Sequence, residues 1–329
     1  MKTRVTEFLE MKNVNGVIKD FIFHCKYEKN LNFKTINAYQ IDLNQFNDHL
    51  LAMGIENINQ ISKLDIKSYL RQISIFKPKT MKRKIASVKA LFNYYEFEHD
   101  DFINPIRKMN INIKEPFKLP IVMTVNDVNR ILEYLYHERS LNNYVDGYTY
   151  KVQTRDIVVI ELLFATGMRV SELCQLECGD VDLSQGVIKV FGKGSKERMI
   201  QICSRDVLSI LKVYKRLFQP ESYFLVNRLG HKLSTQSVRI MVKKCICKCG
   251  LSKQITPHTF RHTFATLLLE EDVDIRYIQN LLGHSSISTT QIYTHVSSGK
   301  LKKILIAKHP RQKIVLNELV LMEEYVKKR

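Results

Sequence analysis

Apolar residues recur every three or four positions through most of the first hundred residues, and this spacing constrains the fold most strongly. Such a period places the apolar side chains on one face of an α-helix. The pattern predicts a short helical stretch followed by four longer helices, over residues 5–11, 17–27, 35–53, 62–73 and 80–97. The four longer helices are enough to close a small core, so residues 1–107 are predicted to form an N-terminal helical domain.

A change in composition separates this part of the chain from the rest. Residues 108–122 contain Pro116 and Pro120, several cations and no regular apolar period. Such a stretch is typical of a connection between domains. Because 329 residues are enough for about two domains, residues 123–329 are predicted to form the second one, with an amphipathic tail over about 300–329.

The second domain is also mostly helical by its apolar pattern, with one β-rich exception. Residues 187–191 and 197–202 alternate between apolar and polar side chains, and a Gly-rich turn joins them. This pattern predicts a β-hairpin with Lys193 at its tip. The polar stretch 137–153, which contains Gly147, is predicted to be a surface loop. The expected fold class is therefore mainly α, with a small antiparallel sheet in a mixed, mostly helical second domain.

The charge of the chain indicates a polyanionic partner. The net charge is +18 and the pI is about 9.5, which favours nucleic-acid binding over a generally basic, solvated surface. Cations crowd the start of the fourth helix, where free backbone N–H groups and the helix dipole already attract phosphate. Contacts to the DNA backbone are predicted, in preference to a merely solvated face, for Lys77, Lys79, Lys82, Arg83, Lys84 and Lys89.

The cysteines and the apolar runs predict a cytoplasmic protein without a membrane segment. The seven cysteines do not pair evenly, no secretory leader is visible, and no run approaches the ~18 apolar residues of a membrane span. Cys245, Cys247 and Cys249 are spaced as C-x-C-x-C, without the paired C-x-x-C of a zinc site. We therefore expect reduced thiols there and no metal.

Two histidines and two arginines have the types and spacing of an anion site. Thr256 and Pro257 are typical of a helix start, and His258 and Arg261 would share one face of that helix. His258 and His262 also have zinc-ligand spacing, but the glutamate that such a motif needs after the first histidine is absent. Arg169 follows a glycine break, from which its guanidinium can reach a phosphate.

Tyr293 follows His284 by nine residues. A single tyrosine in a helix is more often a packed side chain than a nucleophile. The residues that precede it change this assessment, because displacement at a phosphodiester needs a nucleophile, stabilisation of the phosphate charge and a proton for the leaving oxygen. In that reaction Tyr293 would attack while Arg169 and Arg261 clamp the non-bridging oxygens.

The remaining candidates supply the proton transfers. Lys193 would protonate the 5′ oxygen from the hairpin tip, His258 would accept the tyrosine proton, and His284 would orient the phosphate or the nucleophile. This chemistry needs no metal and no nucleotide, so no cofactor is expected.

The ordered set resembles the tyrosine recombinase, or phage integrase, family. Four stretches resemble the family's signature boxes: A-T-G-M-R-V-S-E-L, G-K-G-S-K-E-R, T-P-H-T-F-R-H-T-F-A-T-L-L-L and I-Q-N-L-L-G-H-S-S-I-S-T-T-Q-I-Y-T-H. The pattern Thr35-x-x-x-Tyr39-x-x-Asp42-Leu43 is similar to the family's core-binding domain, and His309-Pro310-Arg311 is similar to Xer-type members. The resemblance extends over nearly the whole chain.

The resemblance implies a SAM-like core-binding domain and a catalytic domain that close around double-stranded DNA. It further implies a 3′-phosphotyrosine intermediate, a Holliday junction, and four copies on two sites, joined by C-terminal tails that dock in neighbouring copies. The amphipathic segment 314–325 would serve as this tail, and docking in a neighbouring copy is preferred to packing on its own domain, although its apolar stripe is compatible with either. Xer-like dimer resolution is the expected role, with an accessory protein as a further partner to consider. The alternatives are an integrase or transposase of a mobile element, a non-catalytic DNA-binding accessory factor, and a type IB topoisomerase.

Overall fold

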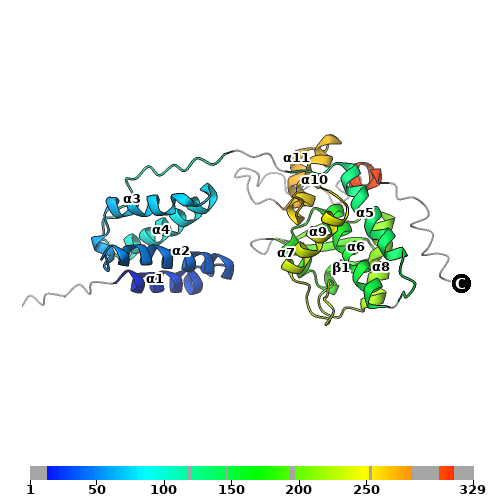
Figure 1. Cartoon of the computed structure of the whole chain (residues 1–329), viewed down its shortest axis with the longest axis horizontal. Coiled ribbons are helices and arrows are strands. Elements are labelled where there is room, and N and C mark those ends of the chain that lie inside the picture. Colours follow the sequence, from blue (N-terminus) through cyan, green and yellow to red (C-terminus); the bar gives the residue numbers. More distant parts are fainter. Residues whose placement is uncertain are drawn as a thin grey trace, which may run out of the picture. The chain divides into compact units, whose positions relative to one another are not determined.

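The computed structural model describes residues 13–116, 121–145, 147–192, 197–251, 254–283 and 304–314. The chain divides into two compact units, Met1–Lys118 and Leu119–Arg329, which are described separately below (Figure 1). The short helical stretch predicted over 5–11 lies outside the described residues, as does the tail after Ile314.

The first unit is the predicted four-helix domain. Its helices are α1 (Val14–Phe23), α2 (Phe33–Ala52), α3 (Lys63–Gln72) and α4 (Pro78–Glu98), and α1 continues into a π-helical turn over His24–Glu28. Leu43, Phe46 and Leu50 of α2 are fully buried against Val88 and Phe92 of α4. The apolar period of the sequence is thus the buried face of each helix, and the four predicted helices are confirmed.

The apolar residues after α4 pack on this first core. Ile106 is buried, and Met109, Ile111 and Ile113 pack against the same cluster. The chain passes from the first unit to the second at Lys118 and Leu119.

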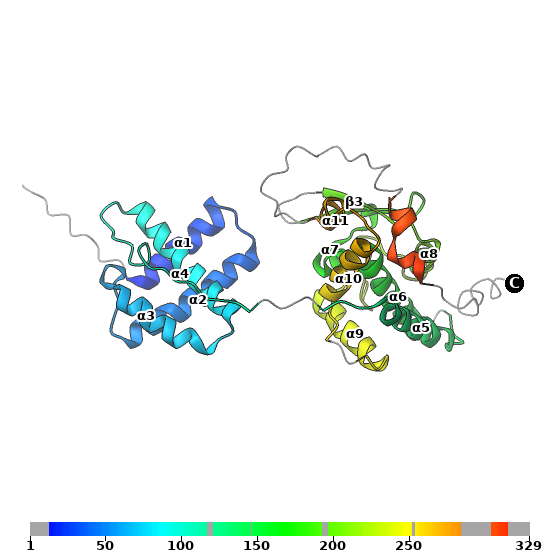
Figure 2. The same ribbon diagram turned by 90° about the horizontal axis from the view of Figure 1, so that it is seen from above.

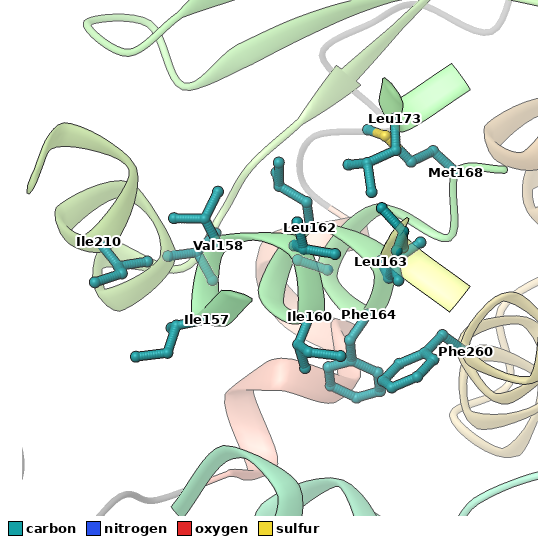
Figure 3. Close-up of a cluster of buried hydrophobic side chains, with 14 of the residues drawn as sticks. Ile157, Val158, Ile160, Leu162, Leu163, Phe164, Met168, Leu173, Ile210 and Phe260 are labelled. Carbon is teal, nitrogen blue, oxygen red and sulfur yellow. The ribbon is translucent and has the colours of Figure 1, made fainter. Parts of the chain in front are cut away.

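Helix α6 (Tyr148–Thr166) lies at the centre of the second unit, with α5 (Val125–Ser140), α8 (Arg205–Phe218) and α10 (Pro257–Glu270) around it (Figures 1 and 2). Its side chains from Ile157 to Ile160 and from Leu162 to Phe164 are all fully buried, and Phe260 of α10 belongs to the same cluster (Figure 3). A helix that is apolar on every side is stable only when other elements cover it. Helix α6 is therefore the scaffold of this unit.

The prediction of a surface loop over residues 137–153 is wrong. Helix α5 continues to Ser140 and α6 begins at Tyr148, so only a short connection remains between them. The polar composition hid a buried residue: Arg139 is buried, and its guanidinium lies 5.6 Å from the ring centre of Tyr136 and 5.4 Å from that of Tyr150. Long side chains can bury their stems and stack on aromatic rings, which composition alone does not reveal.

The predicted hairpin is confirmed as part of a three-stranded antiparallel sheet. Strand β1 (Val181–Asp182) pairs with β2 (Val187–Phe191), which pairs with β3 (Glu197–Gln201). Ile188 and Ile200 face each other across β2 and β3 and are both buried. The hairpin tip, residues 193–196, lies outside the described residues.

Three further helices lie in the described part of the second unit. They are α7 (Val170–Gln175), α9 (Thr235–Lys248) and α11 (Ile275–Leu282). In the described part of the chain, no helix combines the length and the apolar composition that a membrane crossing requires.

Residues 304–314 pack against α6. The His309 ring donates from Nε2 to the carbonyl oxygen of Ala165 at 2.6 Å, and burial lowers the pKa of His309 to about 4. Arg311 is fully buried and donates to both carboxylate oxygens of Glu161 at 3.0 Å each. The chain beyond the Tyr293 region is therefore anchored in its own unit by a neutral histidine and a buried ion pair.

Candidate active site

The turn between α6 and α7 places Arg169 at the edge of the second core. Gly167 ends α6 with φ +60°, and a Cβ atom there would lie 2.5 Å from a ring carbon of Phe264 and 2.8 Å from Leu282. Only glycine combines that backbone conformation with such a close approach. Met168 is fully buried next to it, so Arg169 becomes the N-cap residue of α7 while 31% of its side chain stays exposed.

Glu172 anchors the Arg169 guanidinium. The Arg169 backbone N–H donates to Glu172 Oε2 at 2.9 Å, and Arg169 Nη1 donates to Oε1 at 2.6 Å. The Glu172 side chain is only 4% exposed. Burial by itself would raise the pKa of Glu172, but hydrogen bonds from Arg198 and Arg169 outweigh it and lower that pKa below its ordinary value. Glu172 is thus a charged, buried partner for two guanidinium groups.

Arg261 is held by carbonyl oxygens from two other elements. The Thr256 N–H donates to Thr259 Oγ1 at 3.0 Å at the start of α10, and Arg261 follows one turn into the helix. Arg261 Nη1 donates to the Gly167 carbonyl at 2.8 Å, and Nη2 donates to the Leu282 carbonyl at 2.5 Å. Burial, followed by the charge of Arg169, lowers the pKa of Arg261 to about 10. Its guanidinium therefore remains charged at neutral pH.

His258 lies one turn before Arg261 on α10 and is exposed. Desolvation is the largest cause that lowers its pKa, and the charges of His262, Arg239, Arg261 and Arg169 lower it further. The ring is therefore mainly neutral at pH 7 and able to accept a proton. Within the described ranges, no three His, Cys, Asp or Glu side chains gather as a metal site would require.

Three guanidinium groups converge on the C-terminal end of α11. The carbonyl oxygens of three successive residues, 281 to 283, accept bonds from Arg198, Arg261 and Arg169, respectively. Helix α11 ends at Gly283, which adopts the left-handed conformation with φ +62°. The negative end of a helix dipole favours such cations. This end of α11 directly precedes His284 in the sequence.

The structure brings together three of the six predicted catalytic residues: Arg169, His258 and Arg261. The other three, Lys193, His284 and Tyr293, lie outside the described residues. Glu172 pairs with Arg169 and Arg198, and Arg261 bonds the end of α11 beside them, so the cluster has an excess of positive charge, which suits a phosphate.

Arg198 is a member of this cluster to which sequence reasoning assigned no role. It ends the G-K-G-S-K-E-R box on β3. Residues two apart in a strand share a face, so the buried Ile200 indicates that Arg198 also faces inward. That alternation was the available signal.

Comparisons with known proteins agree with this arrangement. The model of the phage integrase family matches residues 122–300, and the model described as the phage integrase N-terminal SAM-like domain matches residues 18–99. The chain belongs to the phage integrase family. A tyrosine recombinase of Agathobacter rectalis is 45% identical over 307 residues, which cover 92% of this chain and 99% of the relative. Tyrosine recombinase XerD of Staphylococcus saprophyticus is 36% identical over 310 residues, covering 91% and 100%.

A solved structure extends the likeness to the fold. The XerH site-specific recombinase bound to its difH substrate superposes with a TM-score of 0.64 at 25% identity, covering 87% of this chain and 83% of that one. The predicted identity as a tyrosine-type site-specific recombinase, an enzyme that cleaves and rejoins DNA, is confirmed at the level of the family. The predicted fold, a SAM-like domain followed by an integrase catalytic domain, is confirmed as well.

The basic helix α4 of the recombinase's SAM-like domain divides into exposed and buried cations. Lys77, Lys79 and Lys82 are exposed, and Lys89 is half-buried. Lys77, Lys79 and Lys82 lie at the start of α4, where Lys82 pairs with the exposed Glu115 at 3.3 Å, and Lys89 lies in the middle of the helix. Phosphate contact by these four cations stays a prediction.

Arg83 and Lys84 point instead to a buried carboxylate. Asp42 of α2 is fully buried and accepts from Arg83 Nη1 at 2.5 Å, from Lys84 Nζ at 3.3 Å and from Ser87 Oγ at 3.0 Å. Lys84 also donates to Gln45 and is only 3% exposed. A buried carboxylate is stable only with such partners. Lys84 therefore lies inside the unit, away from the surface that the sequence predicts for it, whereas Arg83 remains about half exposed.

Proposed function

We propose that this recombinase cleaves one DNA strand at a specific site by joining Tyr293 to the 3′ phosphate, and later reverses the step to rejoin a new partner strand. One observation carries the proposal: the Arg169 and Arg261 guanidinium groups are fixed by Glu172 and by carbonyl oxygens at the end of α11. Each of these guanidinium groups has five N–H donors and makes two side-chain hydrogen bonds to protein oxygens, so donors remain for two non-bridging phosphate oxygens.

The proposed step conserves atoms and protons. The Tyr293 oxygen attacks phosphorus while the neutral His258 ring takes the hydroxyl proton, consistent with the lowered pKa of that histidine. The bond from phosphorus to the 5′ oxygen breaks, and Lys193 gives that oxygen its proton. His284 orients the phosphate or the nucleophile. Rejoining is the reverse reaction, in which a 5′ hydroxyl attacks the phosphotyrosine ester.

The exposed cations of α4 are proposed to position the duplex. Lys77, Lys79, Lys82 and Lys89 would contact backbone phosphates, with a smaller contribution from the partly exposed Arg83. In this proposal residues 1–107 form the core-binding domain, residues 108–122 the linker and residues 123–329 the catalytic domain, in a protein of the cytoplasm.

The proposed biological role is Xer-like resolution of DNA dimers. It is supported by the XerD relative, which matches this chain over its full length, and by a similar XerC of Thermodesulfovibrio yellowstonii at 34% identity. In this role four copies act on two sites, and an accessory protein can license cleavage. Because residues 304–314 pack on their own unit, docking in a neighbouring copy falls to the tail after Ile314.

The experiment that tests this proposal measures covalent attachment. The wild-type chain first selects its preferred duplex from a randomised pool, and a nicked version of that duplex then traps the cleaved state. We expect wild type to attach to the DNA and Tyr293→Phe to bind without attaching. Arg169→Ala and Arg261→Ala should retain most duplex binding but cleave about 10²–10³-fold more slowly, since each loses one charge-stabilising group among many phosphate contacts.

Three results would contradict the proposal. They are a wild-type chain that never attaches to the selected duplex, a Tyr293→Phe variant that attaches equally well, and an arginine variant that cleaves at the wild-type rate. Relaxation of plasmids that lack the selected site would instead favour a topoisomerase.

A further inference from the structure

Arg198 joins three elements that surround the candidate active site. It lies on β3, two residues after the hairpin tip, and only 12% of its side chain is exposed. Its Nε donates to the Leu281 carbonyl at the end of α11 at 2.9 Å. Its Nη1 and Nη2 donate to Glu172 Oε1 at 3.2 Å and Oε2 at 2.7 Å. All three nitrogens of this guanidinium are thus occupied by protein oxygens.

The two arginines that share Glu172 are bound differently. Arg198 makes a two-pronged bond to the carboxylate, whereas the Arg169 side chain reaches only Oε1 and uses its Nη2 on the Gly283 carbonyl at 3.3 Å. Without Arg198, Glu172 would lose two hydrogen-bond donors. An unsatisfied buried charge is costly, so another donor would be drawn to this carboxylate. The nearest replacement is the Arg169 guanidinium, which would turn from the phosphate toward Glu172.

Arg198 also borders the turn that leads to His284. A Cβ atom on Gly283 would lie 3.2 Å from Arg198 Nη1, so this guanidinium packs directly against the backbone at the end of α11. The same residue therefore connects the strand after the Lys193 turn, the Arg169 anchor and the backbone before His284.

We propose that Arg198 is a positioning residue for strand cleavage, which keeps Arg169 directed at the scissile phosphate by satisfying Glu172 and fixing the end of α11. In this proposal Arg198 acts through Glu172 and the Leu281 carbonyl, to which its three hydrogen bonds go, and not through a phosphate contact of its own. The inference rests on the proposed function, in which Arg169 clamps the phosphate.

The test compares the rate of a single round of cleavage with duplex affinity, using the full-length chain and the nicked selected duplex. Arg198→Ala should cleave about 10²-fold more slowly, as is typical when a partner that orients an active-site group is removed. Its dissociation constant should stay within about twofold of wild type, because no phosphate contact is lost. Arg198→Lys should be slowed about tenfold, since lysine restores a charge beside Glu172 but not the planar fork.

Glu197→Gln is the matched control. Glu197 is the neighbouring residue on β3, and its carboxylate pairs with Lys189 across the hairpin at 2.9 Å in an exposed position. Loss of this surface pair should leave the cleavage rate within about twofold of wild type.

A second readout separates positioning from a general loss of structure. In an Arg169→Ala background, Arg198→Ala should slow cleavage by less than about twofold more, because the group through which it acts is already gone. A purely structural role would multiply the two losses. If Arg198→Ala does not fold, Arg198→Lys carries the same comparison.

Three outcomes would each overturn this inference. They are wild-type cleavage rates in both Arg198 variants, multiplied rate losses in the double variant, and a rate loss that weaker duplex binding explains. These outcomes leave the proposed function intact as long as wild type attaches through Tyr293. Failure of wild type to attach would instead overturn the proposed function.

Discussion

Each of the two units contains a carboxylate that is buried between basic side chains of its DNA-binding or candidate active-site region, and the two have opposite consequences for the proposed DNA contacts. Asp42 of the SAM-like domain is fully buried and draws Arg83 and Lys84 toward the core. Glu172 of the catalytic domain is almost as buried, yet its partner Arg169 keeps 31% of its side chain exposed. The first carboxylate removes a cation from the surface, and the second holds a cation at the surface.

The difference follows from where the partners come from. Arg83, Lys84 and Ser87 all lie on α4, so Asp42 attaches α2 to one helix and uses its acceptors inside the unit. Glu172 receives Arg198 from a distant strand and Arg169 from the start of its own helix. Because Arg198 supplies the two-pronged bond, Arg169 needs only one side-chain bond to Glu172. A basic cluster in sequence therefore predicts DNA contact for the members that stay exposed, and not for a member such as Lys84 that a buried acid draws into the core.

Asp42→Asn tests the structural half of this comparison and should have the largest effect. Removing the charge leaves Lys84 buried without a counter-ion, so the first unit should lose about 4 kcal/mol of unfolding free energy. Urea unfolding followed by circular dichroism measures this loss. Glu115→Gln is the control, because its pair with Lys82 is exposed and should contribute less than about 1 kcal/mol. A loss of similar size in both variants would remove the distinction between buried and surface pairs.

Glycine positions give the next contrast. Gly167→Ala forces an alanine into the left-handed backbone conformation and adds a Cβ atom that overlaps Phe264. The free energy of unfolding of the second unit should therefore fall by about 3 kcal/mol. Gly54→Ala in the first unit meets the same backbone strain, with φ +73°, but has open space around it and should lose only about 1 kcal/mol. Thermal unfolding of both variants checks this ranking. Equal losses would mean that the crowded turn before Arg169 relaxes easily.

Lys82→Ala should have the smallest effect and concerns DNA affinity alone. Lys82 is exposed at the start of α4, so its removal should weaken duplex binding and reduce the log–log salt slope by about one. Lys19→Ala is the control, with the same charge change on the exposed side of α1. Titrations at several salt concentrations compare the two. The assignment of the phosphate-binding face would fail if the Lys19 variant lost as much of the slope as the Lys82 variant.

Local patterns were sufficient for most of the fold. The four helices of the first unit, the hairpin, the glycine break before Arg169 and the end of α11 at Gly283 all follow from periods and turn residues that act over a few positions. The stretch 137–153 was mispredicted because aromatic rings bury Arg139, and a polar residue carries no local sign of that burial.

The sequence by itself determined the family, the fold class and the types of residue at the candidate site, because these depend on order and spacing along the chain. Only the tertiary structure decided how the charges are used. Lys84 meets an acid 42 residues away, Arg198 meets one 26 residues away, and Arg261 reaches a carbonyl 94 residues away. Such contacts depend on which surfaces the folded core brings together. The same guanidinium or ammonium group therefore becomes a phosphate ligand, a positioning group or a core ion pair according to packing.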